Sequence, residues 1–303
     1  MSEKLLVIGS VAYDCIETPD DSADFILGGS ASYAALAASY FAPTIISAVV
    51  GNDFKESDIK RLTARSVDIS NLQFDSAKPT FFWRGKYHEN FNSRETLDVR
   101  LNAYEDFKPA LDENARNAGF VLLGNISPAV QSAVLDLVRE PRFVVLDTMD
   151  LWIGTERDDL MKLVRRCDLL IVNDSEAKML ADTSNIIVAG NTLLKLGAKS
   201  AIVKTGEYGA MLFHKDGFFA IPAYPVASLH DPTGAGDSFA GALAGYLAGC
   251  GKTDFASIKL GMLAGAATAS MTVESFSCYK LEENGLDEIE RRCEYIKKIS
   301  QIQ

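Results

Sequence analysis

Short apolar runs separated by stretches with helical periodicity recur through most of the sequence. They lie at Leu5–Ser10, Thr44–Gly51, Phe120–Gly124, Phe143–Asp147, Leu169–Asn173 and Ala201–Thr205. Runs of this length without polar alternation are typical of strands covered on both faces, as in parallel sheets. The sequence therefore predicts a three-layer, Rossmann-like α/β fold, with a mostly parallel sheet between two layers of helices.

Length and charge limit what such a chain can be. A chain of 303 residues buries roughly 75% of the surface that its unfolded form exposes, so we expect one domain over residues 1–303 without disulfides or structural metal. The net charge of −11 disfavours a nucleic acid partner. Five cysteines without a C-x-x-C pair indicate reduced thiols and a cytoplasmic location. We interpret the first apolar run as a buried strand and not a signal peptide.

Residues 73–106 differ in character from the rest of the chain. Within them, Phe81–Tyr87 alternates aromatic and polar residues, as an exposed strand does. We interpret the segment as a small β lid over the carboxyl ends of the sheet, with residues 11–27 as a candidate second part. The alternative is a hairpin that only caps the core. Because exposed aromatic strands associate unless covered, we expect the lid to form a homodimer.

The C-terminal part is predicted to form long helices at Ser238–Gly249, Phe255–Met271 and Leu286–Ile299. Gly241, Gly245 and Gly249 recur at four-residue spacing in an uncharged run that is too short to span a membrane. This spacing instead predicts close packing of a buried helix against a neighbour.

The stretch Asp231–Gly241 carries the strongest chemical signal. The backbone amides of Gly234, Ala235 and Gly236, followed by a helix, are suited to form an anion hole. Asp237 beside that hole could take the proton from an attacking alcohol. A helix N-terminus lowers a carboxyl pKa, so this position predicts a weak base. The alternative is that Asp237 only caps the helix.

Three other motifs have polar residues where strands meet helices. Asp14 and the Gly28-Gly29 pair before Ser30 could bind the hydroxyls of a polyol. In Asn173-Asp174-Ser175-Glu176, the carboxylate could hold magnesium through water or could only complement the helix dipole. The stretch from Lys204 and Thr205 to Gly206 and Gly209 offers a backbone surface for a nucleotide, although it could be a simple turn between strands.

Taken in this order, the four motifs resemble those of the ribokinase-like carbohydrate kinase family, also called the PfkB family, over nearly the whole chain. The resemblance implies ATP and Mg²⁺ as cofactors, Asp237 as catalytic base, and Gly234, Ala235 and Gly236 as the anion hole. It implies a nucleotide and magnesium side made of Asn173, Glu176, Lys204, Thr205, Gly206 and Gly209. On the acceptor side it implies Asp14, Gly28, Gly29, Ser30, Tyr33 and Asn125.

The sequence departs from the family pattern on the acceptor side. Tyr33 stands where many members have asparagine, Ser30 where ribokinases have lysine, and Asn125 where some relatives have glutamate. Pro232 replaces a threonine after Asp231 in a region that binds potassium in some members, so Asp231 is a candidate ligand for K⁺. Ribose is therefore not the expected substrate.

We expect an ATP-dependent kinase that phosphorylates an alcohol group of a sugar or sugar-like polyol. A nucleoside kinase is the alternative, because Phe81, Phe82, Trp83 and Tyr87 could stack on a base. A phosphosugar kinase would need a cationic cluster from Arg84, Lys86 and Arg94. From a different class, the chain could be a catalytically silent nucleotide- or sugar-binding protein.

Overall fold

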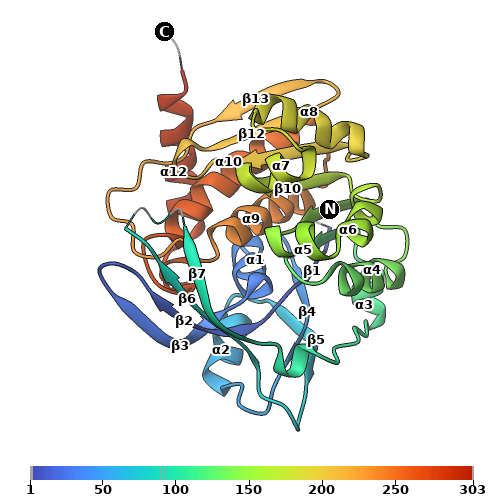
Figure 1. Cartoon of the computed structure of the whole chain (residues 1–303), viewed down its shortest axis with the longest axis vertical. Coiled ribbons are helices and arrows are strands. Elements are labelled where there is room, and N and C mark those ends of the chain that lie inside the picture. The colour runs from blue at the N-terminus through green and yellow to red at the C-terminus, as the bar shows by residue number, and fades with distance from the viewer. Residues whose placement is uncertain (1–2, 90, 92, 302–303) are drawn as a thin grey trace.

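A nine-stranded sheet forms the centre of the computed structural model, which describes residues 3–89, 91 and 93–301 (Figure 1). Its strand order is β13-β12-β11-β10-β9-β8-β1-β4-β5. All pairs from β11 to β5 are parallel, and β12 and β13 continue the sheet antiparallel. The bounds are β1 Leu5–Ile8, β4 Thr44–Val50, β5 Asp68–Phe74, β8 Phe120–Leu123, β9 Phe143–Asp147, β10 Leu169–Asn173, β11 Ser200–Lys204, β12 Ala210–His214 and β13 Gly217–Ile221.

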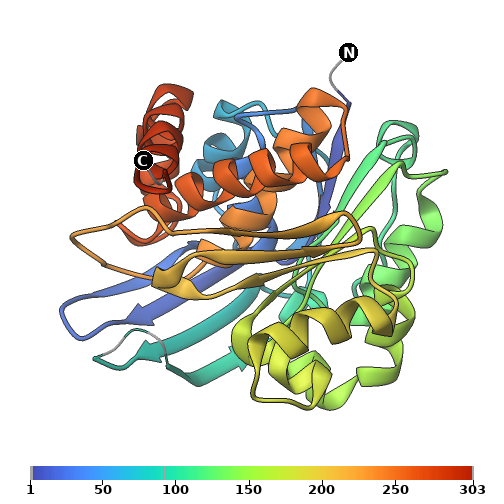
Figure 2. The same ribbon diagram turned by 90° about the horizontal axis from the view of Figure 1, so that it is seen from above.

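Helices cover both faces of this sheet, as Figure 2 shows from above. Alternate residues of β1 enter different cores: Leu5 and Val7 pack with one layer of helices, and Leu6 and Ile8 pack with the other. The first layer contains α1 (Ser30–Ala38), α2 (Glu56–Ala64), α9 (Ala235–Cys250), α10 (Phe255–Thr272), α11 (Tyr279–Glu283) and α12 (Leu286–Ile299). The second contains α3 (Glu113–Arg116), α4 (Pro128–Leu137), α5 (Asp150–Thr155), α6 (Arg157–Val164), α7 (Asp174–Ala181) and α8 (Ile186–Leu196). The predicted three-layer α/β fold is confirmed.

A second, four-stranded sheet combines two segments that are far apart in sequence. Its order is β3-β2-β6-β7, with β2 at Ala12–Glu17, β3 at Ser22–Gly28, β6 at Phe81–Tyr87 and β7 at Arg94–Arg100. The parallel pairing of β2 with β6 joins the expected lid segment to residues 11–27. The expectation that Phe81–Tyr87 is an exposed strand is wrong for Phe82 and Tyr87, because both are buried in small apolar clusters with β2.

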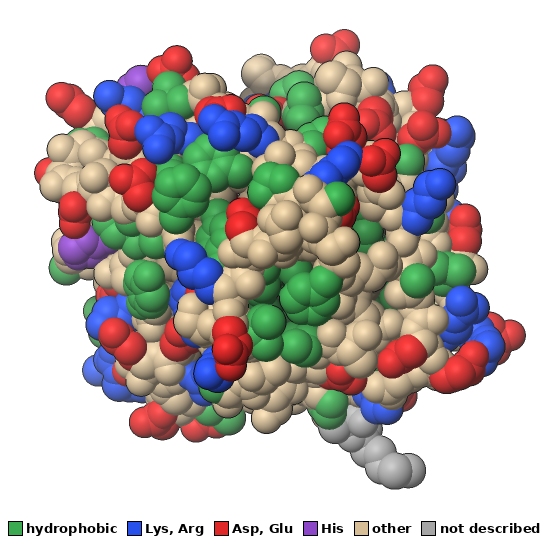
Figure 3. All heavy atoms as spheres, turned by 90° about the horizontal axis from the view of Figure 1, so that it is seen from below, with side chains coloured by type: hydrophobic (Ala, Val, Ile, Leu, Met, Phe, Trp, Pro, Cys, Tyr) green, Lys and Arg blue, Asp and Glu red, His purple; other side chains and the backbone are tan. Residues whose placement is uncertain are grey.

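The small sheet still has exposed apolar side chains. Figure 3 shows its end of the molecule from below, where hydrophobic side chains gather near the centre of the view. Phe25, Leu97, Val99 and Leu101 are exposed on or beside its strands. A homodimer formed through this sheet stays a prediction.

The glycine stripe of α9 lies against α1, as its spacing predicts. A Cβ added at Gly241 would come 2.1 Å from the carbonyl oxygen of Ala34, and one at Gly245 would come 2.7 Å from that of Ala38. Only glycine permits this approach, which places the N-terminus of α9 beside the carboxyl ends of the strands. Among the described residues, no helix is long and apolar enough to cross a membrane.

We predict opposite effects for two glycine-to-alanine substitutions. Gly241→Ala forces a methyl group into the α1 backbone and should destabilise the fold by about 3 kcal/mol, at the upper end for overpacking. Gly154→Ala, in α5, adds a methyl group with nothing within 4 Å, so helix propensity should stabilise by about 0.5–1 kcal/mol. Urea unfolding measures both; equal effects would contradict the proposed α1–α9 packing.

Candidate active site

Three adjacent parallel strands end in polar residues at one edge of the sheet. Asp147 is the last residue of β9, Asn173 of β10 and Lys204 of β11. The start of α9 lies at the same point, since a Cβ added at Gly236 would come 2.7 Å from Lys204 Nζ. The carboxyl edge of a parallel sheet is where α/β proteins place their ligands.

Lys204 is the cation at the centre of this edge. Its Nζ lies 3.6 Å from Asp147 Oδ1, an ion pair whose two side chains are largely buried. Burial alone would lower the pKa of Lys204, but the carboxylates of Asp147, Glu176 and Asp237 outweigh it and raise that pKa. Lys204 is therefore charged at neutral pH and available to bind phosphate oxygens.

Asp237 lies in the first turn of α9, but it is not the capping residue. The N-cap is Gly234, whose φ of 76° lies in the left-handed region. Burial and the nearby Asp147 raise the pKa of Asp237 to about 7, although Lys204 and Arg94 lower it. The expected lowering of this pKa by the helix is thus outweighed by burial, and Asp237 has the pKa of an effective base near neutral pH.

The loop before α9 offers fewer free amides than the sequence predicts. The amide of Ala235 donates to the carbonyl of Pro232 at 3.2 Å, closing a turn with Gly234 at its left-handed position. Ala235 is therefore not a free donor, which corrects the expectation of three anion-hole amides. Among the described residues, the amides of Gly234 and Gly236 have no protein acceptor.

Glu176 and Asn173 form a capping box at the start of α7. The side chain of Asn173 accepts from the amide of Glu176 at 2.8 Å, and Glu176 Oε2 accepts from the amide of Asn173 at 2.7 Å. Burial raises the pKa of Glu176 to about 7. Both the magnesium and the helix-terminus interpretations fit this position.

A cavity of about 550 Å³ extends from this edge in two directions. On one side it reaches Phe91 and Arg94 of the small-sheet region and Asn125 after β8. On the other side it is lined by the turn after β11, the loop after β13 and one face of α10. The predicted Asn173, Glu176, Lys204, Gly206, Gly209, Gly234, Ala235, Gly236 and Asp237 all line it.

The turn after β11 is fixed by its backbone. Thr205 donates from its amide and its hydroxyl to the carbonyl of Gly209, at 2.8 and 3.0 Å. Gly206 and Gly209 both have positive φ, and a Cβ at Gly209 would come 2.0 Å from the carbonyl oxygen of Ile221. The close approach to Ile221 therefore requires glycine at position 209, and the left-handed backbone favours glycine at position 206.

Asp14 lies in β2 with its carboxyl against the chain at Gly28. A Cβ at Gly28 would come 1.8 Å from Asp14 Oδ2, and Gly29 has φ 89°. Burial and Asp231 raise the pKa of Asp14 to about 8. Its cross-strand neighbours are Ile26 and Trp83, so this buried acid lies between apolar side chains.

Other predicted acceptor residues are placed differently. Ser30 Oγ donates to the carbonyl of Asn125 at 2.9 Å and accepts from the amide of Ser10, so it joins α1 to the ends of β1 and β8. Tyr33 is buried against Gly234. Neither lines the cavity, nor do Asp14, Gly28 and Gly29, whereas Asn125 does. Asn125 Oδ1 accepts from Trp152 Nε1 at 2.9 Å. Contacts of Ser30 and Tyr33 with a substrate stay predictions.

Asp231 is buried at the start of the loop that leads into α9. Its Oδ1 accepts from the amide of Thr233 at 2.9 Å, whereas its buried Oδ2 has no hydrogen-bond partner. Burial raises its pKa to about 6. Within the described ranges, no group of three or more His, Cys, Asp or Glu side chains is arranged to bind a metal ion by itself.

Asp147 was not predicted as a site residue, and Arg94 was expected only within the cationic cluster of a phosphosugar kinase. Asp147 ends a strand that was correctly predicted, so a polar residue closing an apolar run was the available signal. Arg94 lines the cavity, whereas Arg84 pairs with Asp24 and Lys86 with Glu17. The three cations expected for a phosphosugar kinase are therefore not gathered at the site.

Comparison with known proteins agrees with this arrangement. Residues 2–284 match the model of the pfkB family carbohydrate kinases. The chain is 29% identical over 252 residues to a cytidine kinase of Thermococcus kodakarensis, covering 81% of this chain and 89% of that protein. It is 25% identical over 291 residues to a nucleoside kinase of Methanocaldococcus jannaschii, covering 91% and 92%.

A solved structure with a similar fold is a putative ribokinase II from E. coli in complex with ATP and Mg²⁺. It superposes with a TM-score of 0.78 at 21% identity, covering 97% of this chain and 99% of that one. The family match spans the strands, the small sheet and the loop before α9 described above. This chain belongs to the pfkB family of carbohydrate kinases.

Proposed function

We propose that this protein transfers the γ-phosphoryl group of ATP to a hydroxyl group of a nucleoside, with Asp237 as the general base. The observation that carries the proposal is the position of Asp237. It is buried in the first turn of α9, beside Lys204 and two free amides, on a cavity that extends to both sides. The chemistry needs a base beside a phosphoryl-binding hole.

The donor would occupy the side of the cavity formed by the turn after β11, the loop after β13 and α10. Ala223, Pro225, Val226, Ala266 and Ala269 give this side an apolar surface suited to a nucleotide base. Lys204 and the start of α9 lie at its inner end, where the phosphates would bind. The E. coli neighbour was solved in complex with ATP and Mg²⁺, which supports ATP as the donor.

The carboxylates of this edge fit a magnesium ion accompanying ATP. Asp147 Oδ1 is buried and has only the ion pair with Lys204 at 3.6 Å, with no closer hydrogen-bond partner, and Glu176 lines the same cavity. Mg²⁺ prefers oxygen ligands and keeps several waters, so these two residues would hold it through water. When bound, the ion neutralises charge on the phosphates.

The acceptor would lie near Asp14, under the small sheet. Ile16, Ile26 and Tyr87 form a buried cluster there, and Trp83, Phe91 and Phe276 pack against it. A carboxyl group among apolar and aromatic side chains suits a ligand that has hydroxyls on one part and a flat ring on another. That description fits a nucleoside better than a free sugar, and the cytidine and nucleoside kinases among the relatives support it.

The small sheet would act as the lid of this acceptor side. Tyr87 Oη and Thr233 Oγ1 lie 3.0 Å apart, so β6 is in direct contact with the loop that leads into α9. Closure over the acceptor would exclude water from the phosphoryl group. Asp231, with its unpartnered Oδ2, would hold a potassium ion that orders the same loop.

We predict that Asp237→Asn lowers kcat by about 10² to 10⁴, the usual contribution of a general base. The amide keeps the size of the side chain but cannot accept the proton. ADP binding, measured by calorimetry, should stay within a few-fold of wild type. Asp254→Asn is the matched control, because Asp254 caps α10 outside the site. More than about a tenth of wild-type kcat in Asp237→Asn would remove it from the base role.

The pH dependence of the reaction should report the pair of Asp147 and Asp237. Activity needs the deprotonated base, so kcat/KM for ATP should fall as the pH drops below about 7. Asp147 raises the pKa of Asp237, so Asp147→Asn should move this fall to lower pH even if it also reduces the maximum. Glu113→Gln, in an exposed ion pair, should leave it unchanged. No movement in Asp147→Asn would contradict the coupling.

The acceptor class is tested with a panel of nucleosides, free pentoses, hexoses and inositols. We expect cytidine or another nucleoside to give the highest kcat/KM. Trp83→Ala should lower it by about 5- to 150-fold, the range for loss of one aromatic stacking partner of a base. Phe74→Ala, an exposed aromatic residue at the end of β5, should have no effect. A free sugar that outperforms every nucleoside would show a sugar kinase instead.

A further inference from the structure

We infer that Arg292 of the C-terminal helix α12 is a positioning residue for the nucleotide base of the donor. This inference rests on the proposed function. Helix α12 begins at Leu286, beyond the residues that the family model matches. Arg292 nevertheless contacts two side chains that line the donor side of the cavity, Tyr224 and Ser270.

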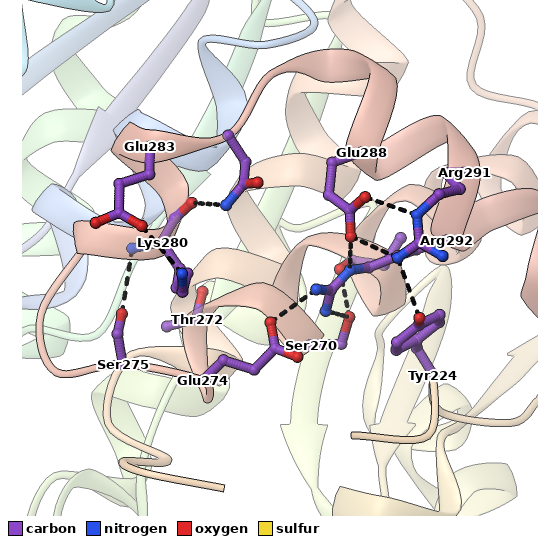
Figure 4. Close-up of polar contacts among 12 residues, drawn as sticks. Tyr224, Ser270, Thr272, Glu274, Ser275, Lys280, Glu283, Glu288, Arg291 and Arg292 are labelled. Carbon is purple, nitrogen blue, oxygen red and sulfur yellow. Dashed lines mark hydrogen bonds and ion pairs between the residues drawn. The ribbon is translucent and has the colours of Figure 1, made fainter. Parts of the chain in front are cut away.

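Arg292 is buried and connects three segments of the chain, as Figure 4 shows. Its Nη1 donates to Ser270 Oγ of α10 at 2.9 Å, and its Nη2 donates to Glu274 Oε2 at 2.7 Å. Its Nε donates to Glu288 Oε1, one turn earlier in α12, at 2.7 Å. A planar guanidinium spreads its donors over three nitrogens in a fixed fork, whereas the donors of a lysine are all on one nitrogen and cannot reach these separated acceptors together.

The same guanidinium supports Tyr224 of the loop after β13. It lies over the ring, 4.6 Å from the centroid. Two further residues of α12 fix this ring, since Arg291 Nη2 donates to Tyr224 Oη at 3.2 Å and the Tyr295 ring lies 5.4 Å away. The residues after β13 up to Gly234 form neither helix nor strand. The contacts with α12 therefore stabilise a segment of the cavity wall that has no regular secondary structure of its own.

The hydrogen bond from Arg292 to Glu274 also fixes the end of α10. Val273, the residue before Glu274, lines the cavity, and its carbonyl accepts from the amides of His230 and Asp231. Arg292 thus contacts both walls of the donor side, the loop after β13 and α10, but does not line the cavity itself. The effect of losing it should depend on the base of the ligand and not on its phosphates.

Arg61 provides a closely matched control. It binds Glu282, donates to Ser277 Oγ at 3.1 Å and lies over the Tyr279 ring at 4.8 Å, the same kinds of contact as Arg292 makes. Neither Ser277 nor Tyr279 lines the cavity. Replacing each arginine by lysine therefore removes similar interactions. Those of Arg292 include contacts with residues that line the donor side of the cavity, and those of Arg61 are with residues that do not.

The test is calorimetric binding of ADP and of tripolyphosphate, each with magnesium, to the full chain. Arg292→Lys should weaken ADP about tenfold and leave tripolyphosphate within twofold, because only ADP carries a base. Arg61→Lys should change neither affinity, although both variants should lower the melting temperature. Tyr224→Ala should reproduce the ADP defect, and combining it with Arg292→Lys should add little further loss.

Equal ADP affinity in wild type and a folded Arg292→Lys would overturn the inference. So would an equal loss for ADP and tripolyphosphate, or the same loss in Arg61→Lys. If Arg292→Lys does not fold, Glu274→Gln removes one charged partner and should give a smaller loss confined to ADP; an unchanged ADP affinity there would also overturn it. A wild-type protein that binds no ADP would instead contradict the proposed function.

Discussion

The site depends on the interaction of one buried lysine, Lys204, with three buried carboxyl groups. Burying an unpaired charge is expensive, and at the sheet edge Lys204 is close enough to Asp147, Glu176 and Asp237 to affect the pKa of each. The group can form only where parallel strands end together and a helix N-terminus reaches them. That requires the close contact of α9 with α1, which the glycine stripe permits. The packing of two helices therefore sets the electrostatics of the site.

The excess of acid over base explains why the site suits its proposed ligands. Lys204, with Arg94 also near Asp237, does not balance the three carboxylates, so they cannot all ionise easily, and burial raises the pKa of each. A magnesium ion would balance the negative charge of the carboxylates, and the phosphates would accept hydrogen bonds from Lys204 and the α9 amides. The pKa of Asp237 lies at about 7 because burial and Asp147 raise it, while Lys204 and Arg94 lower it.

Much of the fold could be predicted from local pattern, because apolar runs and glycine spacing are properties of neighbouring residues. Strands β9 and β10 have the predicted bounds, and α12 does as well. The pairing of β2 with β6 and the burial of Phe82 could not be predicted, since both depend on contacts between distant segments. Asp147 is not part of a recognisable sequence motif, so its role could not be predicted. Arg292 contacts a loop and a helix that come together only in the folded chain. The occupied amide of Ala235 likewise depends on turn geometry that the residue types leave open.

The central claim is that Lys204 and its carboxylate neighbours tune Asp237 as a base near neutral pH. Carbon-13 NMR of aspartate carboxyls, recorded against pH, tests it most directly. The account predicts a resonance that titrates near pH 7 in wild type, is absent from Asp237→Asn, and titrates at higher pH in Lys204→Met, where the cation that lowers this pKa is gone. A resonance assigned to Asp237 that titrates in the ordinary range for aspartate, or does not move in Lys204→Met, would contradict it.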